Sequence, residues 1–264
     1  MSFASISGVT LHYSLTGARD GSPLILVNSL GTDLRIWNEV VPLLAGHFRV
    51  LCYDKRGHGL SDVPPGPYGI DDHVADLNGL AAHVGFKTFA LCGISIGGMI
   101  AARFAALHPS SVRSLVLADT GAAIGTAPMW NERIATVRAG GMSAIADAVL
   151  GRWVTPAYRT SNPAASAGWR NMLERCSPEG YAASCATVRD TDLTADLARI
   201  SAPTLVLVGD GDIVTPPEMA QRLAGGIPHA RLREIRDAGH VPAIEQPRAL
   251  AELIREHINE VAHV

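Results

Sequence analysis

The chain has 264 residues, of which 47% are hydrophobic and 18% are charged, and its formal net charge is −3. This length allows one large domain with a well-buried core, and the composition is ordinary for a soluble protein. The weak negative charge argues against a basic surface for nucleic acid or for a membrane. We expect no membrane span, because no stretch approaches about 18 consecutive apolar residues.

The cellular setting is predicted from the first residues and from the cysteines. The first residues alternate polar and apolar side chains, without the charged start and apolar run of a signal peptide. The four cysteines, Cys52, Cys92, Cys176 and Cys185, show no close pairing pattern. We therefore expect a reducing cytoplasm and no disulfides. CxxC and CxxH pairs are absent from the sequence, so we predict no zinc site and no cofactor.

Predicted strands and helices alternate along most of the chain. A hairpin over residues 4–15, turning at Gly8, comes first. Apolar runs typical of buried strands follow at 23–28, 48–54, 89–93, 114–119, 203–210 and 230–235. Helical patterns occupy 70–84, 96–107, 217–223 and 247–261. This alternation predicts an α/β fold with a mostly parallel eight-stranded sheet flanked by helices, whose catalytic groups gather at the carboxyl ends of the strands.

Residues 125–190 interrupt this alternation after the sixth predicted strand. They contain helical stretches without a convincing strand, and three of the four tryptophans, Trp130, Trp153 and Trp169. Because the α/β alternation resumes on both sides, we predict a helical cap over the active end of the sheet. Residues 1–124 and 191–264 would then form the core. The alternative is a second helical domain that takes no part in the site.

Gly93, Ser95 and Gly97 form a G-x-S-x-G pattern between a predicted strand and a predicted helix. In that context the serine stands on a sharp turn, and the glycines avoid clashes where strand and helix nearly touch. The helix N-terminus would place positive dipole near a developing oxyanion. Ser95 is therefore the candidate nucleophile. The alternative is a glycine turn with an incidental serine.

The candidate base is sought after the nucleophile, because the fold expected around this pattern orders its catalytic residues as Ser, acid and His. His240 follows the last predicted strand and a loop of small residues, which would place its imidazole over the active end of the sheet. His257 lies in the final predicted helix, and His263 lies in the terminal tail. We therefore predict that His240 is the base.

The candidate acid should follow the strand before that histidine. Asp210 and Asp212 both stand after the predicted strand 203–210, and Asp212 is carried further toward the histidine. Asp212 would fix the tautomer of His240 and stabilise the imidazolium, whereas Asp210 would tie the turn through local hydrogen bonds. Asp119, at the end of the predicted strand 114–119, is the other possible acid.

The loop after the predicted strand 23–28 is the candidate oxyanion segment. The backbone N–H groups of Leu30 and Ile96 could together stabilise a tetrahedral intermediate. The alternative is an ordinary loop after a strand. His58 lies in the polar, glycine-rich turn 53–62, and we predict a structural role for it, because Arg56 and Asp54 can lock such a turn with hydrogen bonds.

These residues together resemble the 3-oxoadipate enol-lactonase family, which has the α/β-hydrolase fold, over nearly the full length of the chain. The segments NSLGTD, WNERI and SPEGYAASCATVRD carry most of the resemblance, whereas the elbow GISIGG and the turn RGHG occur in many hydrolases. Asp119 departs from the residue expected at its position. The resemblance implies hydrolysis of a five-membered enol-lactone to 3-oxoadipate through an acyl-enzyme on Ser95, within the β-ketoadipate pathway of aromatic catabolism.

The substrate that the resemblance implies is a small lactone with a free carboxylate, for which a buried guanidinium would be a suitable anchor. Arg133 and Arg152 are the candidates, and Trp130 and Trp153 would shape the pocket. The alternative for either arginine is a place on the surface.

Three rival functions remain open, because a fold does not determine a function. They are another small-ester or lactone hydrolase, a cofactor-free perhydrolase, and a ligand-binding receptor without turnover. In each case we expect a small-molecule partner, and neither nucleic acid nor a membrane.

Overall fold

Eight strands form one sheet in the computed structural model, which describes residues 2–262. The strands are β1 (Ser2–Ile6), β2 (Val9–Thr16), β3 (Ser22–Val27), β4 (Phe48–Tyr53), β5 (Phe89–Ile94), β6 (Val112–Ala118), β7 (Thr204–Gly209) and β8 (Arg231–Ile235). Their order across the sheet is β1-β2-β4-β3-β5-β6-β7-β8. β2 pairs antiparallel with β1 and β4, and all other neighbours are parallel. The predicted eight-stranded, mostly parallel sheet with a hairpin at one edge is confirmed.

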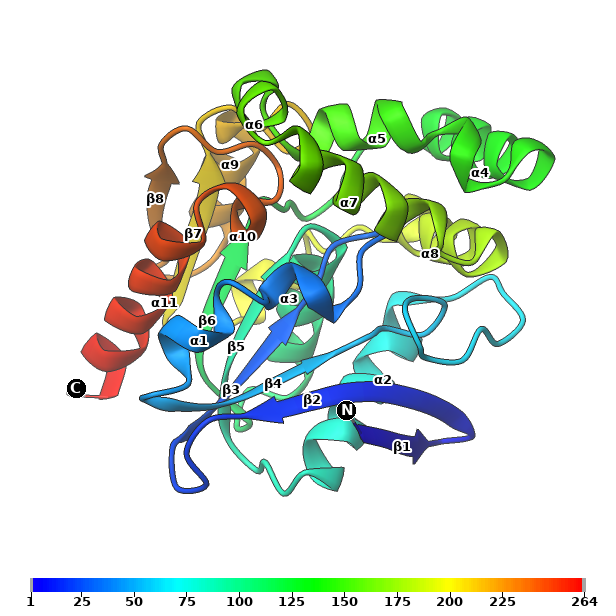
Figure 1. Cartoon of the computed structure of the whole chain (residues 1–264). Helices are drawn as coiled ribbons and strands as arrows, with labels where there is room; N and C mark the ends of the chain where they lie inside the picture. Colours follow the sequence, from blue (N-terminus) through cyan, green and yellow to red (C-terminus); the bar gives the residue numbers. More distant parts are fainter. Residues whose placement is uncertain (1, 263–264) are drawn as a thin grey trace.

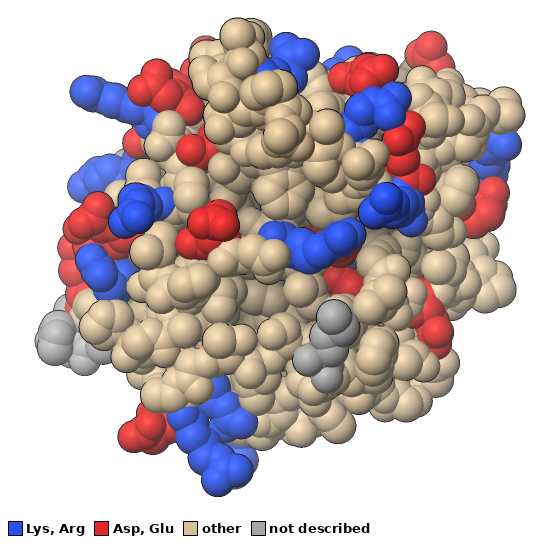
Figure 2. All heavy atoms as spheres, in the orientation of Figure 1, with Lys and Arg blue, Asp and Glu red and all other residues tan. Residues whose placement is uncertain are grey.

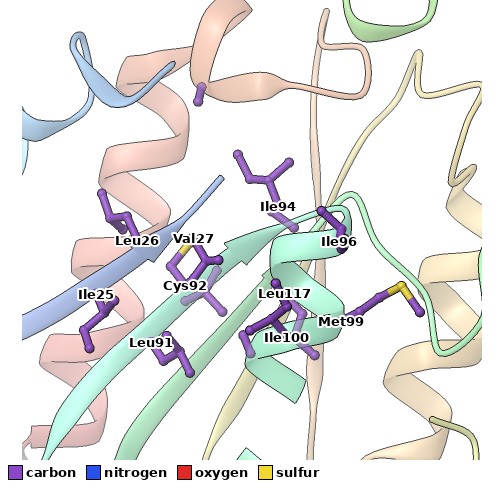
Figure 3. Close-up of a cluster of buried hydrophobic side chains, with 14 of the residues drawn as sticks. Ile25, Leu26, Val27, Leu91, Cys92, Ile94, Ile96, Met99, Ile100 and Leu117 are labelled. Carbon is purple, nitrogen blue, oxygen red and sulfur yellow. The ribbon is translucent and has the colours of Figure 1, made fainter. Parts of the chain in front are cut away.

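The central strands are buried on both faces. Every residue of β5 is buried, and so are the last four residues of β3. Leu91 of β5 lies opposite Ile25 of β3 and Cys92 lies opposite Leu26, and Figure 3 shows these side chains with Ile100 on the neighbouring helix. Continuous apolar runs of this kind are typical of parallel strands covered by helices on both sides.

Helices cover the sheet and connect its parallel strands (Figure 1). The predicted helices are present as α2 (Ile70–His83), α3 (Ile96–Leu107), α9 (Pro217–Gly226) and α11 (Pro247–Ala262). Three short elements were not predicted, namely the 3-10 turn η1 (Leu34–Trp37), α1 (Val41–Leu44) and α10 (Pro242–Glu245). Each has four residues, which is too few to show a helical period in the sequence.

Five helices lie between β6 and β7, after the sixth strand as predicted. They are α4 (Ala127–Gly140), α5 (Ala146–Trp153), α6 (Pro156–Ser161), α7 (Pro163–Glu174) and α8 (Pro178–Asp190), with two further 3-10 turns, η2 (Met142–Ala144) and, after α8, η3 (Leu197–Arg199). Figure 1 shows α4–α8 above the end to which the parallel strands point. We call α4–α8 the cap helices. The division into a core of residues 1–124 and 191–264 and a cap of residues 125–190 stays a prediction.

Further observations concern the thiols, the surface and the length of the helices. All four cysteines are buried and free, and the reducing, cytoplasmic location stays a prediction. On the face shown in Figure 2, basic and acidic side chains are interspersed. Within residues 2–262, no helix has both the length and the apolar character that a membrane span requires. His263 lies outside the described residues.

Candidate active site

Ser95 stands on the sharp turn between β5 and α3. Its backbone has φ 59° and ψ −122°, which is a strained conformation for a residue with a side chain. The turn is held by hydrogen bonds from the Ser95 N–H to the Ala118 carbonyl (3.1 Å) and from Thr120 Oγ1 to the Ser95 carbonyl (2.7 Å). Hydrogen bonds to Ala118 at the end of β6 and to Thr120 just after it therefore stabilise the strained backbone of Ser95.

The glycines on either side of Ser95 are required by close packing. A Cβ atom on Gly93 would lie 2.1 Å from the Gly97 carbonyl oxygen, and one on Gly97 would lie 2.3 Å from the Val27 carbonyl oxygen. Real Cβ atoms do not approach backbone oxygens this closely, so α3 could not start so near to β3 and β5 with other residues at these positions.

His240 and Asp212 form a buried pair behind Ser95. The imidazole Nδ1 donates a hydrogen bond of 2.9 Å to Asp212 Oδ2, and both residues are 3% exposed. Asp212 lies in the loop after β7, and His240 lies in the loop between β8 and α10. Ser95 and His240 line the same cavity. The structure thus brings together the three residues that the sequence suggested.

Asp212 is also held by the loop that follows it. Its Oδ1 accepts from the Val214 N–H (2.7 Å) and the Thr215 N–H (3.1 Å), and its Oδ2 accepts from Thr215 Oγ1 (2.6 Å). Burial opposes ionisation of this carboxyl, but His240 and the donors of Thr215 and Val214 outweigh burial and lower its pKa to about 2. Asp212 is therefore an anion at neutral pH.

Asp119, the other possible acid, lies beside Asp212. It is fully buried at the end of β6, and its Oδ1 accepts from the Gly209 N–H (2.8 Å). Burial and the neighbouring Asp212 raise the pKa of Asp119 well above its ordinary value. Two adjacent buried carboxyls do not both ionise readily, and the raised pKa makes Asp119 the group that keeps its proton.

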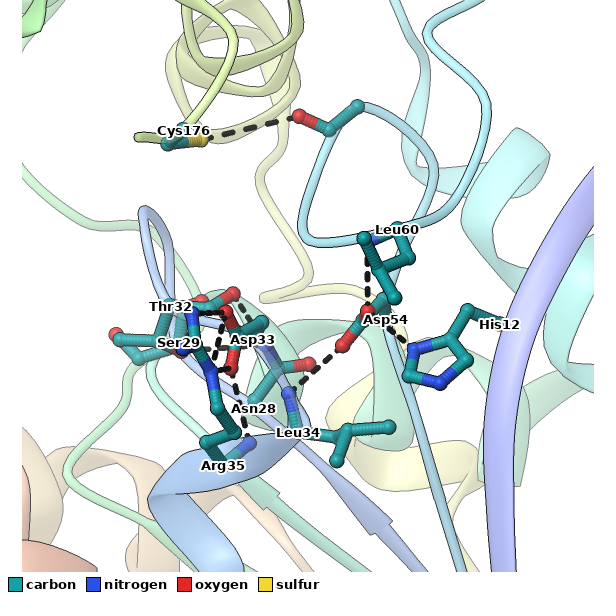
Figure 4. Close-up of polar contacts among 11 residues, drawn as sticks. His12, Asn28, Ser29, Thr32, Asp33, Leu34, Arg35, Asp54, Leu60 and Cys176 are labelled. Atoms are coloured by element: carbon teal, nitrogen blue, oxygen red, sulfur yellow. Dashed lines mark hydrogen bonds and ion pairs between the residues drawn. The ribbon is translucent and has the colours of Figure 1, made fainter. Parts of the chain in front are cut away.

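Leu30, in the loop after β3, and Ile96, at the start of α3, are the predicted oxyanion donors. Leu30 lines the cavity together with Ser95, and Ile96 is the first residue of α3, where the backbone N–H has no partner within the helix. The Leu30 loop is tied internally, as Figure 4 shows for Asn28, Ser29 and Thr32. Thr32 Oγ1 donates to the Ser29 carbonyl (2.8 Å), and Asn28 Nδ2 donates to the Thr32 carbonyl.

The turn after β4 makes hydrogen bonds to the loop that contains Leu30. His58 Nε2 accepts from the Gly31 N–H (2.9 Å), and its Nδ1 lies 3.2 Å from the Arg56 carbonyl. Burial and the nearby Lys55 ammonium lower the pKa of His58 to about 3, so it is a neutral acceptor. Asp54 accepts from the Leu34 N–H and from His12 (Figure 4). His58 has the structural contacts that the sequence suggested.

The cavity that Ser95 lines has a volume of about 350 Å³, and residues of α4, α5 and α8 line it together with residues of the core. Its lining includes all four substrate-binding candidates, Trp130, Arg133, Arg152 and Trp153. It also includes Tyr181, which we did not single out from the sequence. Among the described residues, no group of three His, Cys, Asp or Glu side chains could hold a metal ion.

Arg133 differs from Arg152 in its surroundings. Its guanidinium carbon lies 5.2 Å from the ring centroid of Trp130, and the guanidinium contacts the hydroxyl of the buried Tyr181. Arg133 is half-buried, whereas Arg152 is exposed. Among the salt bridges of residues 2–262, neither arginine has an acidic partner. Both cations line the cavity without an acidic partner, and Arg133 is the more buried of the two.

The loop of His240 is attached to the cap helices through Glu245 of α10. Glu245 Oε1 accepts from the N–H (3.0 Å) and the Oγ1 (2.7 Å) of Thr155, and Oε2 accepts from the Gly239 N–H (2.6 Å). The Val241 N–H donates to the Trp153 carbonyl (3.0 Å). These contacts attach Trp153, which lines the cavity, to the loop that contains His240.

Several supporting residues were missed in the sequence, among them Thr215, Tyr181 and Glu245. Thr215 stands three residues after Asp212, a spacing at which a hydroxyl can bond back to a carboxylate. That signal was available in the sequence. Tyr181 has no such local signal, and neither does the contact of Glu245 with Thr155, because these partners are far away in the chain.

Comparison with known proteins identifies the family of this chain. The sequence profile of the alpha/beta hydrolase family matches residues 24–253. 3-Oxoadipate enol-lactonase 2 of Acinetobacter baylyi is 37% identical over 91% of this chain and 90% of its own length.

Solved structures agree as well. The enol-lactonase of Burkholderia xenovorans has a TM-score of 0.96 and 36% identity, covering 98% of this chain and all of its own. A thermophilic esterase of Thermogutta terrifontis has a TM-score of 0.92 and 32% identity, covering 98% of each chain. The resemblance to the enol-lactonases is confirmed, and the chain is a hydrolase that belongs to the alpha/beta hydrolase family.

Proposed function

We propose that this hydrolase opens 3-oxoadipate enol-lactone to 3-oxoadipate, using Ser95 as nucleophile, His240 as base and Asp212 as the acid that orients the base. The observation that carries the proposal is the cavity in which Ser95 and His240 face Arg133, a cation without an acidic partner among the described residues. The names of the two enol-lactonases described above support the choice of lactone. The reaction would serve the β-ketoadipate pathway of aromatic catabolism.

The first half of the reaction forms an acyl-enzyme. Ser95 Oγ attacks the lactone carbonyl carbon while His240 Nε2 takes the hydroxyl proton. The carbonyl oxygen becomes an oxyanion, which the N–H groups of Leu30 and Ile96 stabilise. The bond between the carbonyl carbon and the ring oxygen then breaks, and the proton on His240 passes to the leaving enol oxygen. The enol tautomerises to the ketone while the acyl group stays on Ser95.

The second half releases the product. A water molecule loses a proton to His240 and attacks the acyl carbon, and the Ser95 oxygen leaves and recovers that proton. Asp212 remains ionised throughout and stabilises the imidazolium, which accords with its low pKa. The product gains the elements of one water molecule, so no cofactor is needed.

The carboxylate of the substrate would be bound by Arg133. Its planar guanidinium offers paired donors to a carboxylate, and stacking on Trp130 holds it in place at little entropic cost. Arg152 is the second candidate, because it lines the cavity from α5. Trp130 and Trp153 are both buried and would pack against the ring.

The test is the loss of ultraviolet absorbance of freshly generated 3-oxoadipate enol-lactone with the purified protein. We expect rapid decay with the wild type and decay at the background rate with Ser95→Ala. Arg133→Ala should raise KM about tenfold or more, as expected for a lost charged contact, and Arg152→Ala should raise it less. An unchanged KM in both variants would disprove the anchor.

Other outcomes separate the rival functions. Cleavage of simple aryl esters without lactone decay would make the protein an esterase, a reaction for which the similarity to the Thermogutta terrifontis esterase is the supporting observation. Peroxide-dependent halogenation would indicate a perhydrolase. Binding of the lactone without turnover of either substrate would favour the receptor.

A further inference from the structure

Lys55 is a buried cation that the proposed mechanism does not use. It follows β4, its side chain is fully buried, and the chain has one other lysine, the exposed Lys87. Burial lowers the pKa of Lys55 to about 7. Taking an ammonium group out of water is costly unless it is well paired, so the partners of Lys55 should account for its position.

Those partners are the carbonyl groups of the oxyanion loop. Lys55 Nζ donates to the Asn28 carbonyl oxygen (3.0 Å) and to the Ser29 carbonyl oxygen (2.9 Å). The ammonium has three donors and the neutral amine has two hydrogens, so both contacts persist on either side of a pKa near 7. Lys55 thus contacts the backbone of the loop from its buried side.

These contacts also determine where the opposite side of the loop points. The Ser29 carbonyl and the Leu30 N–H belong to one peptide unit, in which a planar trans bond directs the two groups in opposite directions. A carbonyl held toward Lys55 therefore turns the Leu30 N–H away from Lys55. Ser29, Leu30 and Ser95 all line the catalytic cavity.

The neighbouring groups of the loop are occupied in other ways. Thr32 Oγ1 donates to the same Ser29 carbonyl (2.8 Å), and the Gly31 N–H donates to His58 (2.9 Å). Lys55 and Thr32 therefore hold the one carbonyl whose peptide carries the candidate oxyanion donor. Lys55 supplies the stronger contact of the two, because it alone can bear a charge.

We propose that Lys55 is a positioning residue that directs the Leu30 N–H toward the oxyanion formed on the carbon attacked by Ser95. The inference rests on the proposed hydrolytic mechanism and deepens it. Lys55 touches neither substrate nor reacting atoms. Its loss should weaken the transition state more than the ground state, because the oxyanion exists only in the former.

The first experiment compares Lys55→Met with Lys87→Met, the same change at an exposed site. With p-nitrophenyl acetate and with the enol-lactone, Lys55→Met should lower kcat roughly 10- to 100-fold, because losing one oxyanion donor costs about 100- to 1000-fold and here the donor is misdirected, not removed. KM should change by less than about twofold. Lys87→Met should match the wild type, and Lys55→Arg, which keeps donors, should recover part of kcat.

The second experiment uses an aryl trifluoromethyl ketone, whose adduct with Ser95 places an oxyanion in the same position. Across the folded variants among Lys55→Met, Lys55→Gln and Lys55→Arg, its inhibition constant should rise in proportion to the fall in kcat/KM. Adipate, a dicarboxylate without a reacting carbonyl, should bind all variants equally. A merely structural role would weaken both ligands together.

Either of two results would overturn the proposal: an unchanged trifluoromethyl ketone affinity in a folded variant with reduced kcat, or a wild-type kcat in folded Lys55→Met. Failure of the proposed function is distinguishable from these. Ester hydrolysis without lactone hydrolysis would disprove the proposed lactone substrate. The comparison of Lys55 variants with p-nitrophenyl acetate would still test the role of Lys55. Full activity of Ser95→Ala would remove the mechanism itself.

Discussion

Asp212, the partner of His240, has a second buried carboxyl group beside it, that of Asp119. The roles of the two carboxyl groups differ because their surroundings differ. Asp212 receives three hydrogen bonds from its own loop and a fourth from His240, whereas Asp119 receives one from the Gly209 N–H. The carboxyl group with more hydrogen-bond donors carries the charge, and the other carboxyl group keeps its proton. This division supports Asp212 as the acid and makes Asp119 a neutral neighbour.

Replacing Asp119 by Asn should therefore preserve activity and change the pH dependence of stability. The pKa of Asp119 is raised on folding, so the folded chain retains a proton that the unfolded chain releases above about pH 4. As the pH rises from about 4 toward the pKa of Asp119 in the folded protein, the free energy of unfolding of the wild type falls by up to about 1.4 kcal/mol per pH unit. Asp119→Asn has no such proton, and its amide oxygen can still accept from the Gly209 N–H.

The measurement is urea unfolding between pH 4 and pH 8. The free energy of unfolding of Asp119→Asn should rise relative to wild type as the pH increases, with kcat within about threefold. The exposed Asp210→Asn is the matched control and should follow the wild-type curve. Parallel curves for Asp119→Asn and wild type would show that Asp119 is ionised in the folded protein.

At the scale of the elements, the short helix α10 joins the histidine loop to the cap helices. Glu245 at its end accepts two hydrogen bonds from Thr155 and one from Gly239, next to His240. These contacts connect the junction of α5 and α6 with the loop after β8. The position of the cavity wall and that of the base are consequently coupled.

Glu245→Ala should lower both stability and activity. Three donors lose a charged acceptor, which should cost about 2–4 kcal/mol in the free energy of unfolding. KM should rise and kcat should fall together, because Trp153 and His240 are displaced from each other. Thermal unfolding and steady-state kinetics measure the two effects. The exposed Glu252→Ala on α11 should change the free energy of unfolding by less than about 0.5 kcal/mol, and equal effects of the two variants would refute the coupling.

At the scale of the whole molecule, the cap helices are packed onto the core at several points. A Cβ on Gly180 of α8 would lie 2.2 Å from the Gly57 carbonyl oxygen, and Thr187 donates to the Tyr68 carbonyl (2.8 Å). Leu173 and Tyr181 both approach Gly31 of the oxyanion loop. The apolar side of the cap helices is therefore covered by the core.

We expect the cap and the core to unfold in one cooperative transition. In Trp37→Phe, the three remaining tryptophans, Trp130, Trp153 and Trp169, all report on the cap helices, while circular dichroism reports on the whole chain. The two signals should give the same urea midpoint. An earlier fluorescence midpoint would instead show that the cap unfolds as an independent domain, in accord with the predicted boundaries 125–190.

The sequence by itself determined the eight strands, the four long helices, the elbow at Ser95 and the place of the cap helices. These features depend on local patterns, because apolar runs, helical periods and glycine spacing act within about 15 residues. The order Ser95, Asp212 and His240 along the chain also selected the candidate triad.

Only the tertiary structure decided which buried groups support that site. Lys55 and Ser29 are 26 residues apart, Thr155 and Glu245 are 90 apart, and Asp119 and Gly209 are also 90 apart. No local pattern records such pairs, because they arise where the ends of parallel strands meet under the cap helices. The preference for Arg133 over Arg152 likewise depends on the packing of Trp130 and Tyr181 around one guanidinium, which the spacing of residues along the chain does not contain.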